Sequence, residues 1–367
     1  MVRSMRLTDR RPQLDAQQLV ARFRPPHRFE DVRFENYRPD PEHPSQRAAL
    51  ERLKTFATTV DAERRRSGRA ARLWSSATRL WSSGTRLWSL ATRKRSRRPR
   101  QTESKPAIYI DGGFGVGKTH LLAALWHASS GPKAYVTFEE LTAFVGFSGM
   151  TRAVEALRDY RLICIDEFEL DDVANTLLIV SLLRGLLESG ETRLATTSNT
   201  LPDRLGEQRF SASEFKREIA AIAAYFEELP IDGPDYRARS TAPLGSGEAT
   251  GNVADPGDNN TELVTSDEFD DLLGHLRTVH PVHYAAMLDG VSTVKIHGVR
   301  QIIHQDDALL WVQFIDELYD ARISVQITGA AVDQTFSPAY RNGGFRKKYG
   351  RAESRAWAME AESAGIQ

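Results

Sequence analysis

Between residues 105 and 198 the chain repeats a short apolar run followed by an amphipathic stretch. The apolar runs are rich in Ile, Val, Leu and Ala, which predicts buried strands. The stretches between them carry apolar residues at helical spacing, as in Leu121–His127 and Val173–Glu188. Such alternation predicts an α/β fold, with a parallel sheet and helices on both faces. The expected strands are Ala107–Ile110, Ala134–Phe138, Leu162–Ile165 and Arg193–Thr197.

Shorter segments flank this central block. Before it, Ser45 is a favourable N-cap and Gln46–Ala57 has apolar residues on one helical face, so we expect an ordered N-terminal segment over residues 1–60. After it, residues 238–266 are rich in Gly, Pro and Asn, which is typical of a flexible linker. A smaller C-terminal domain is expected over residues 267–360. Its elements would be a helix containing Phe269, Leu272, Leu273 and Leu276, a helix containing Val312, Ile315 and Leu318, and a strand at Ile323–Ile327.

Residues 61–105 contain a tandem repeat followed by a basic run, Arg93–Arg100. The three copies are Arg72–Thr78, Arg79–Thr85 and Arg86–Thr92. If helical, the repeat would present a stripe of Leu-Trp pairs beside arginines, which favours contact with an anionic membrane or another polyanion. Serine, threonine and Gly84 disfavour a helix, so the preferred interpretation is a disordered insertion produced by duplication.

Charge is distributed unevenly along the chain. The first hundred residues carry 25 basic and 10 acidic side chains, whereas the remaining 267 carry 24 and 39. We therefore expect a basic arm on an acidic globular body. The single cysteine, Cys164, excludes an internal disulfide and a Cys-rich zinc site, and we interpret it as a buried apolar side chain. No apolar run approaches the roughly 18 residues that would cross a bilayer, and no secretory signal is evident, so the cytoplasm is the expected compartment.

The strongest chemical signal directly follows the first expected strand. Residues 112–119 read Gly-Gly-Phe-Gly-Val-Gly-Lys-Thr and match G-x-x-x-x-G-K-[ST] without a mismatch. Glycines let backbone amides point at phosphate oxygens, and the N-terminus of the following helix adds partial positive charge. Lys118 would bind the β- and γ-phosphates, and the Thr119 hydroxyl would bind Mg²⁺. We therefore expect an ATP site formed by Gly112, Gly113, Phe114, Gly115, Val116, Gly117, Lys118 and Thr119.

Two further strands end in polar residues. Leu162–Ile165 runs into Asp166 and Glu167. Asp166 would hold Mg²⁺ mainly through the water molecules of the metal, and Glu167 would act as the general base for the attacking water. The next strand ends at Asn199, which we expect to contact the γ-phosphate or the attacking water; a helix N-cap before Pro202 is the alternative role.

Several blocks of the chain resemble the ZapE-type (AFG-like) AAA+ ATPases. Residues 166–174 resemble the D-E-F-x-V-x-D-x-A block of that family, and residues 197–205 resemble T-S-N-x-x-P-x-x-L. Residues 34–46 look like the N-terminal block of the actinobacterial branch. Further similar blocks are residues 235–237, 314–320 and 354–359, although Ala356 stands where the family has Leu. The resemblance covers about residues 29–60 and 105–360.

The resemblance implies an AAA+ nucleotide-binding domain over residues 106–237 and a ring-shaped homo-oligomer, with a hexamer favoured. It also implies a catalytic arginine supplied by a neighbouring subunit. The family stretch G-L-Q-R corresponds here to Gly-Glu-Gln-Arg at residues 206–209, so Arg209 is the first choice for this arginine and Arg217 the second.

The expected function is Mg²⁺-dependent ATP hydrolysis that remodels a protein partner. The resemblance implies a role in bacterial cell division, with a tubulin-like division-ring protein as partner. The expected protein is cytoplasmic. Peripheral contact with the inner face of the membrane at the division site, through the tandem repeat, is the alternative to the preferred interpretation of the repeat as a disordered insertion. The alternative is a nucleic-acid-associated ATPase of the helicase-loader type, which the basic N-terminal segment keeps open. The C-terminal domain shows no helix-turn-helix signal, so nucleic acid is the less favoured partner.

Overall fold

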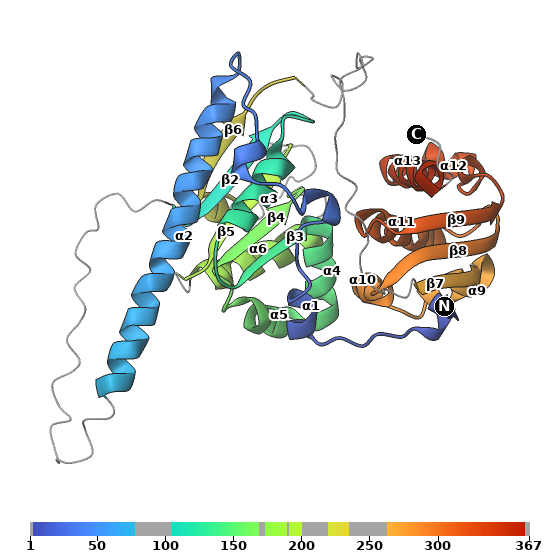
Figure 1. Ribbon diagram of the computed structural model, residues 1–367, viewed down its shortest axis with the longest axis horizontal. Helices are drawn as coiled ribbons and strands as arrows, with labels where there is room; N and C mark the ends of the chain where they lie inside the picture. Colours follow the sequence, from blue (N-terminus) through green and yellow to red (C-terminus); the bar gives the residue numbers. More distant parts are fainter. Residues whose placement is uncertain are drawn as a thin grey trace. The chain divides into compact units, whose positions relative to one another are not determined.

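A computed structural model describes residues 3–77, 105–168, 173–188, 191–199, 219–234 and 263–363. The chain divides into two compact units (Figure 1). The central unit comprises Val32–Thr142 and Met150–Ala242. The terminal unit comprises Met1–Asp31, Ala143–Gly149 and Pro243–Gln367. The predicted N-terminal segment, residues 1–60, is therefore divided between the two units.

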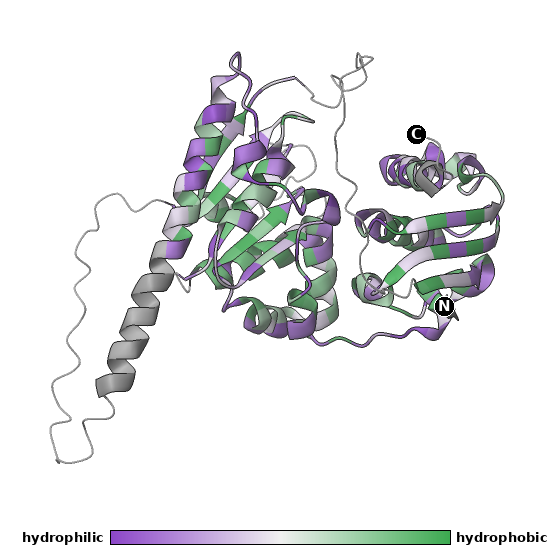
Figure 2. Cartoon of the chain, viewed as in Figure 1, coloured by the Kyte–Doolittle hydropathy of each residue, from purple (hydrophilic) through white to green (hydrophobic). Residues whose placement is uncertain are grey.

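The central unit contains a five-stranded parallel sheet with the strand order β3-β4-β5-β2-β6. Its strands are β2 (Ala107–Gly112), β3 (Lys133–Thr137), β4 (Leu162–Asp166), β5 (Arg193–Ser198) and β6 (Phe226–Ile231). The first four match the predicted strands to within two residues. Apolar residues, green in Figure 2, predominate in β2 and β4, and these residues are buried. Because β4, β5 and β2 are neighbours, their carboxyl ends lie together at one edge of the sheet.

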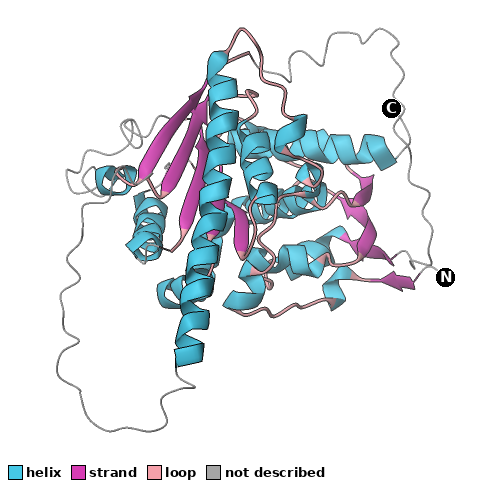
Figure 3. Ribbon diagram, turned by 60° about the vertical axis from the view of Figure 1, so that its left-hand side comes forward, coloured by secondary structure: helices cyan, strands magenta, loops and turns pink. Residues whose placement is uncertain are grey.

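Helices lie on both faces of this sheet, as predicted (Figure 3). They are α3 (Lys118–Ala128), α5 (Met150–Leu157), α6 (Val173–Glu188) and the start of α4 (Phe138–Ser148), whose residues from Ala143 onward belong to the terminal unit. Helix α6 has the predicted bounds, whereas α3 begins three residues before the predicted Leu121, directly at Lys118. Buried leucines and alanines between Leu121 and Leu125 pack α3 against β4 and β5.

The N-terminal helix of the central unit is longer than predicted. Helix α2 spans Pro44–Ala77, so the prediction of Gln46–Ala57 was too short at both ends. Residues 61–77 are helical, so the prediction of a disordered insertion over residues 61–105 was wrong for that part; residues 78–104 lie outside the described residues. Proline is tolerated in the first turn, where its missing N–H would have no helical partner. Ser45 does not cap this helix; its hydroxyl contacts the carboxylate of Asp232. Further along α2, Arg52 makes two hydrogen bonds to Glu227 of β6, at 2.7 and 2.6 Å. This helix is thereby fixed to the edge strand of the sheet.

The terminal unit contains a second parallel sheet, with the order β1-β7-β8-β9. Its strands are β1 (Arg3–Met5), β7 (Leu263–Glu268), β8 (Val291–Val299) and β9 (Ser324–Gly329). The pairing of β1 with β7 explains why the start of the chain belongs to this unit. Residues 263–266 lie in β7, so the predicted linker extends too far at its C-terminal end; residues 238–262 lie outside the described part of the chain.

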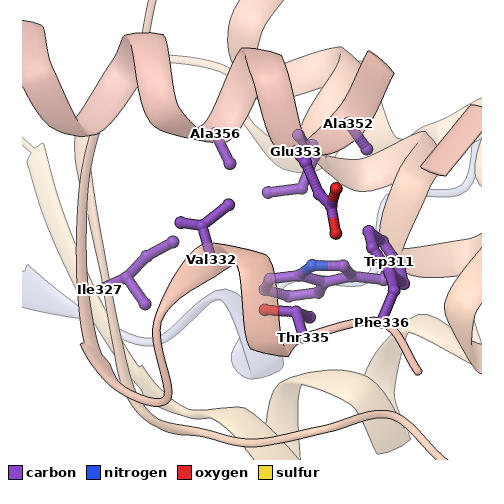
Figure 4. A pocket seen from close by; sticks show the side chains of 9 residues that line it. Trp311, Ile327, Val332, Thr335, Phe336, Ala352, Glu353 and Ala356 are labelled. Carbon is purple, nitrogen blue, oxygen red and sulfur yellow. The ribbon is translucent and has the colours of Figure 1, made fainter. Parts of the chain in front are cut away.

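The core of the terminal unit is built around aromatic side chains on its helices. The principal helices are α9 (Phe269–Leu276), α11 (Gln305–Asp320) and α13 (Arg346–Ser363), and the first two contain the apolar residues that predicted them. The ring of Trp311 packs edge-on against Phe269, with ring centroids 5.1 Å apart. A cavity of about 10 Å³, room for about one water molecule, lies between α11, α13 and β9 (Figure 4). Ala356 lines this cavity.

An ion-pair network joins α11 to α13. The half-buried carboxylate of Asp316 is 2.9 Å from Arg351 and 2.8 Å from Arg355. Burial raises the pKa of Asp316, although both arginines act to lower it. Asp316 and Arg355 belong to two blocks, residues 314–320 and 354–359, which the sequence identified separately. Their shared contact shows that these blocks hold two helices of one unit together.

None of the helices in the described ranges is long and apolar enough to cross a membrane.

Candidate nucleotide-binding site

A glycine-rich loop connects β2 to α3 in the central unit. The φ angles of Gly112, Gly115 and Gly117 are 154°, 69° and 94°, in a region that other residues rarely adopt. A Cβ atom at Gly117 would lie 2.8 Å from Cε2 of Tyr37, and one at Gly112 would lie 2.1 Å from the carbonyl oxygen of Ile231. Both the backbone conformation and the close neighbours therefore require glycine at these positions.

The side chain of Lys118 folds back over this loop. Its Nζ donates hydrogen bonds to the carbonyl oxygens of Gly112 and Gly113, at 2.8 and 2.6 Å. It also donates to Oδ1 of Asn199, which follows β5, at 2.9 Å. The structure thus brings together two residues that were predicted to contact the γ-phosphate from different parts of the sequence. The N-cap alternative for Asn199 concerns residues after 199 that lie outside the described part of the chain.

Asp166 lies at the carboxyl end of β4, beside Thr119. The Thr119 hydroxyl is 3.2 Å from Oδ1 of Asp166. Two further hydroxyl groups contact this buried carboxylate: that of Thr197 at Oδ1, and that of Tyr135 at Oδ2, 2.9 Å away. A buried carboxylate needs such donors to replace the water that it loses on folding.

Glu167 leaves the strand in a left-handed backbone conformation, with a φ of 53°. This conformation is unfavourable for a residue other than glycine and requires support from its surroundings. Thr197 supplies part of that support, because the Glu167 N–H donates to its hydroxyl at 3.1 Å and the Phe168 N–H donates to its carbonyl oxygen at 2.7 Å. Phe168 is buried, whereas the Glu167 side chain is exposed at the sheet edge.

The N-terminal block of the central unit supports the glycine-rich loop from outside. The Tyr37 hydroxyl is 3.4 Å from the carbonyl oxygen of Val116, and its ring centroid lies 5.5 Å from that of His120. Partial burial lowers the pKa of His120. Gln46, fully buried, accepts a hydrogen bond from the Asp40 N–H and donates one to the Asp232 carbonyl oxygen. These contacts anchor the block beside the loop.

Sequence reasoning missed three residues of this arrangement. Thr197 lies in the polar end of the strand from which only Asn199 was selected, and a threonine at the end of a parallel strand beside the phosphate loop was a usable signal. Tyr135 and Tyr37 gave no local signal, because their contacts depend on strand register and on packing between distant segments. Arg209 and Arg217 lie outside the described residues.

The two apolar side chains of the glycine-rich loop, Val116 and Phe114, differ in their exposure to solvent. Val116 is 1% exposed, and Phe114 is 68% exposed at the tip of the loop. Cys164 is fully buried in β4, as expected from the sequence, and burial raises the pKa of its thiol.

The site fits a magnesium nucleotide by the chemistry of its donors. Hydroxyl and carboxylate oxygens are the ligands that Mg²⁺ prefers. Thr119 and Asp166 bring such oxygens within 3.2 Å of each other. The ammonium group of Lys118 and the N-terminus of α3 supply the positive charge that a triphosphate requires.

The fold and the site together define a P-loop nucleotide-binding protein of the AAA+ class. The chain belongs to the AFG1-like ATPase family, whose model matches residues 14–254 and 258–365. This confirms the family resemblance, and at the level of the family it confirms an ATPase. The assignment to the actinobacterial branch stays a prediction.

Curated relatives are similar over part of the chain. The cell division protein ZapE of Escherichia coli K12 is 32% identical over 148 residues, which cover 36% of this chain and 38% of the relative. Lactation elevated protein 1 homolog B of Danio rerio is 32% identical over 94 residues, 25% of this chain and 18% of the relative. The matches thus span less than half the length of these relatives.

Solved structures also resemble the chain in part. The DnaC helicase loader superposes with a TM-score of 0.37 at 16% identity, covering 56% of this chain and 99% of that one. DnaI superposes with a TM-score of 0.38 at 15% identity, covering 57% and 93%. Likeness at this level carries no conclusion about function.

Thr197→Val should slow ATP turnover about ten-fold while leaving nucleotide affinity nearly unchanged. The substitution keeps the shape of the side chain but removes the hydroxyl that contacts both Asp166 and the Glu167 N–H, a loss of about 1–3 kcal/mol. Phosphate-release and nucleotide-binding assays would measure the two quantities.

Thr196→Val is the matched control. Thr196 is equally buried on the same strand, and its hydroxyl has no hydrogen-bond partner among the residues that the structure describes. Equal turnover in the two variants would show that the contacts of Thr197 do not matter for catalysis.

Proposed function

We propose that this protein hydrolyses ATP in a Mg²⁺-dependent reaction at the carboxyl edge of the central sheet. The observation that carries the proposal is the convergence of Lys118, Thr119 and Asp166 at this edge, with Glu167 turned outward beside them. These groups supply, in order, a phosphate-binding cation, a magnesium ligand, an acceptor for metal-bound water, and a base.

Each residue has a distinct task in this reaction. Lys118 exchanges its contacts with the loop carbonyls and Asn199 for contacts with the β- and γ-phosphates. Thr119 would bind magnesium directly and Asp166 would hold it through its water molecules, and the metal would neutralise phosphate charge. The Glu167 carboxylate accepts a proton from the attacking water, and the Asn199 amide orients that water or the γ-phosphate. The exposed position of Glu167 gives solvent water access to the base.

Two substitutions separate binding from hydrolysis. Lys118→Ala should abolish ATP binding, because the phosphates lose the only full positive charge that the predicted loop motif provides. Glu167→Gln should bind ATP normally and lose turnover, because its carboxylate serves the water and not the nucleotide. Binding of a fluorescent ATP analogue and release of phosphate measure both effects. Unchanged turnover in Glu167→Gln would remove Glu167 from its role.

We propose that the partner of this ATPase is a protein and that the two act in bacterial cell division. Support comes from the family membership and from the printed name of the E. coli relative, a cell division protein. A tubulin-like division-ring polymer is the proposed substrate of remodelling. The competing candidate is nucleic acid, favoured only by the basic N-terminal hundred residues. Turnover measured with and without each polymer separates the two, since the true partner should stimulate hydrolysis.

We also propose that the active form is a ring, favouring a hexamer, in which Arg209 of one subunit stabilises the γ-phosphate of the next. An arginine in this role accelerates phosphoryl transfer roughly 10³-fold or more. Arg209→Ala should then bind ATP and turn over slowly. Mixing it with Lys118→Ala should restore part of the activity, because one variant supplies the arginine and the other the pocket. Failure of this rescue, with turnover of Arg209→Ala near wild type, would move the role to Arg217.

A cytoplasmic protein with peripheral membrane contact is the remaining proposal, and it concerns the tandem repeat. Six basic residues lie between Arg93 and Arg100, and each contributes about 1 kcal/mol near an anionic surface. Full-length protein should therefore sediment with anionic vesicles at low salt and not at high salt. Replacing the six residues with glutamine should abolish sedimentation and leave ATP turnover intact. If the wild-type protein does not sediment with anionic vesicles at low salt, the tandem repeat and its basic run do not bind membranes.

A further inference from the structure

Both oxygens of the Asp166 carboxylate are held by hydroxyl groups. Oδ1 contacts Thr119 and Thr197, which lie at the phosphate loop and at the end of β5. Oδ2 accepts from Tyr135, whose hydroxyl is 2.9 Å away. Tyr135 differs from the other two donors, because it lies in the middle of β3, is 2% exposed and belongs to no nucleotide-binding motif.

The strand register explains how Tyr135 reaches this carboxylate. Strands β3 and β4 are parallel, with Tyr135 opposite Cys164 and Thr137 opposite Asp166. Tyr135 therefore starts two residues short of Asp166, about 6–7 Å along the strand direction. A short hydroxyl side chain could not span that interval, whereas the phenol ring places its oxygen beside Oδ2.

The contact at Oδ2 controls the orientation of the carboxylate. The terminal torsion of aspartate has a broad, roughly two-fold energy profile, so hydrogen bonds must select its angle. Rotation about the Cβ–Cγ bond moves both oxygens together. Thr119 and Thr197 restrain this rotation at Oδ1, and Tyr135 restrains it at Oδ2, on the opposite side of the group. The contact of Tyr135 therefore narrows the range of angles that the carboxylate can adopt.

We propose that Tyr135 is a positioning residue for magnesium, which orients the Asp166 carboxylate toward the water shell of the metal. This role rests on the proposed function. Groups that orient the partners of a bound metal typically change metal affinity 10–100-fold when they are removed. A tyrosine that served only to satisfy a buried carboxylate would affect the stability of the fold and not the affinity for the metal.

The test measures metal binding directly in the Tyr135→Phe variant. This substitution removes one oxygen atom and keeps the buried aromatic ring. Titration of the protein–ATP complex with Mn²⁺, followed by the loss of the signal of free Mn²⁺ in electron paramagnetic resonance, gives the half-saturating metal concentration. We expect that concentration to rise about ten-fold or more, while ATP affinity in the presence of EDTA stays at the wild-type value.

Tyr284→Phe serves as the control. It removes a hydroxyl that is also buried and hydrogen-bonded, at 3.0 Å to the carbonyl oxygen of Leu276, but lies in the terminal unit. Metal half-saturation in this control should equal that of the wild type.

The outcomes separate this role from the proposed function. A wild-type half-saturating concentration in Tyr135→Phe, whether or not the melting temperature falls, would overturn the positioning role and leave the proposed function standing. Wild-type protein that bound neither ATP nor metal would overturn both. A shift in Tyr135→Phe that Tyr284→Phe does not share would support the role.

Discussion

The geometry of the central unit depends on the hydrogen bonds that surround the buried carboxylate of Asp166. An ionised carboxylate that leaves water is costly unless hydrogen-bond donors surround it, and here the donors come from three separate elements. Tyr135 lies on β3, Thr197 on β5 and Thr119 on α3. Any slip of one of these elements against β4 would remove a donor from the carboxylate. The same hydrogen bonds that satisfy a buried charge therefore set the register of the sheet edge at which the chemistry takes place.

The phosphate loop depends on a second constraint, which comes from the N-terminal part of the central unit. Gly117 leaves room for the ring of Tyr37, and Gly112 leaves room for the backbone of β6 at Ile231. Gln46 and Arg52 fix helix α2 to β6 and the residue after it, through hydrogen bonds to Glu227 and Asp232. Residues 32–60 are thus part of the nucleotide site, although they precede the glycine-rich motif by more than fifty residues. An N-terminal segment that folded apart from the sheet would not place Tyr37 against Gly117 and so would not restrict the loop to glycine at that position.

Local patterns in the sequence predicted the parts of the site that local chemistry determines. A short apolar run that ends in polar residues identified Asp166, Glu167 and Asn199, and the glycine-rich motif identified Lys118. Tyr135 could not be identified in this way, because its role follows from the register of β3 against β4. The first strand of the terminal sheet was also missed, since three residues carry no periodicity and its partner, β7, lies some 260 residues away. Helix α2 was predicted too short, because the mostly polar sequence beyond Val60 lacks the apolar periodicity that marked its first turns.

The terminal unit shows that a family-specific block need not mark a catalytic group. Arg355 stands in the closing block of the chain, where an arginine invites comparison with residues that contact phosphate. Its guanidinium instead lies 2.8 Å from Asp316 and 4.9 Å from the ring centroid of Tyr319, both on α11. Moving the Arg355 guanidinium away from Asp316 and Tyr319 would cost free energy, because the half-buried Asp316 carboxylate would lose a positive neighbour that offsets its burial. Both blocks therefore reflect one requirement, the fixed packing of α13 on α11. Because Arg355 is engaged in that packing, Arg209 and Arg217 remain our candidates for the proposed arginine that acts on phosphate.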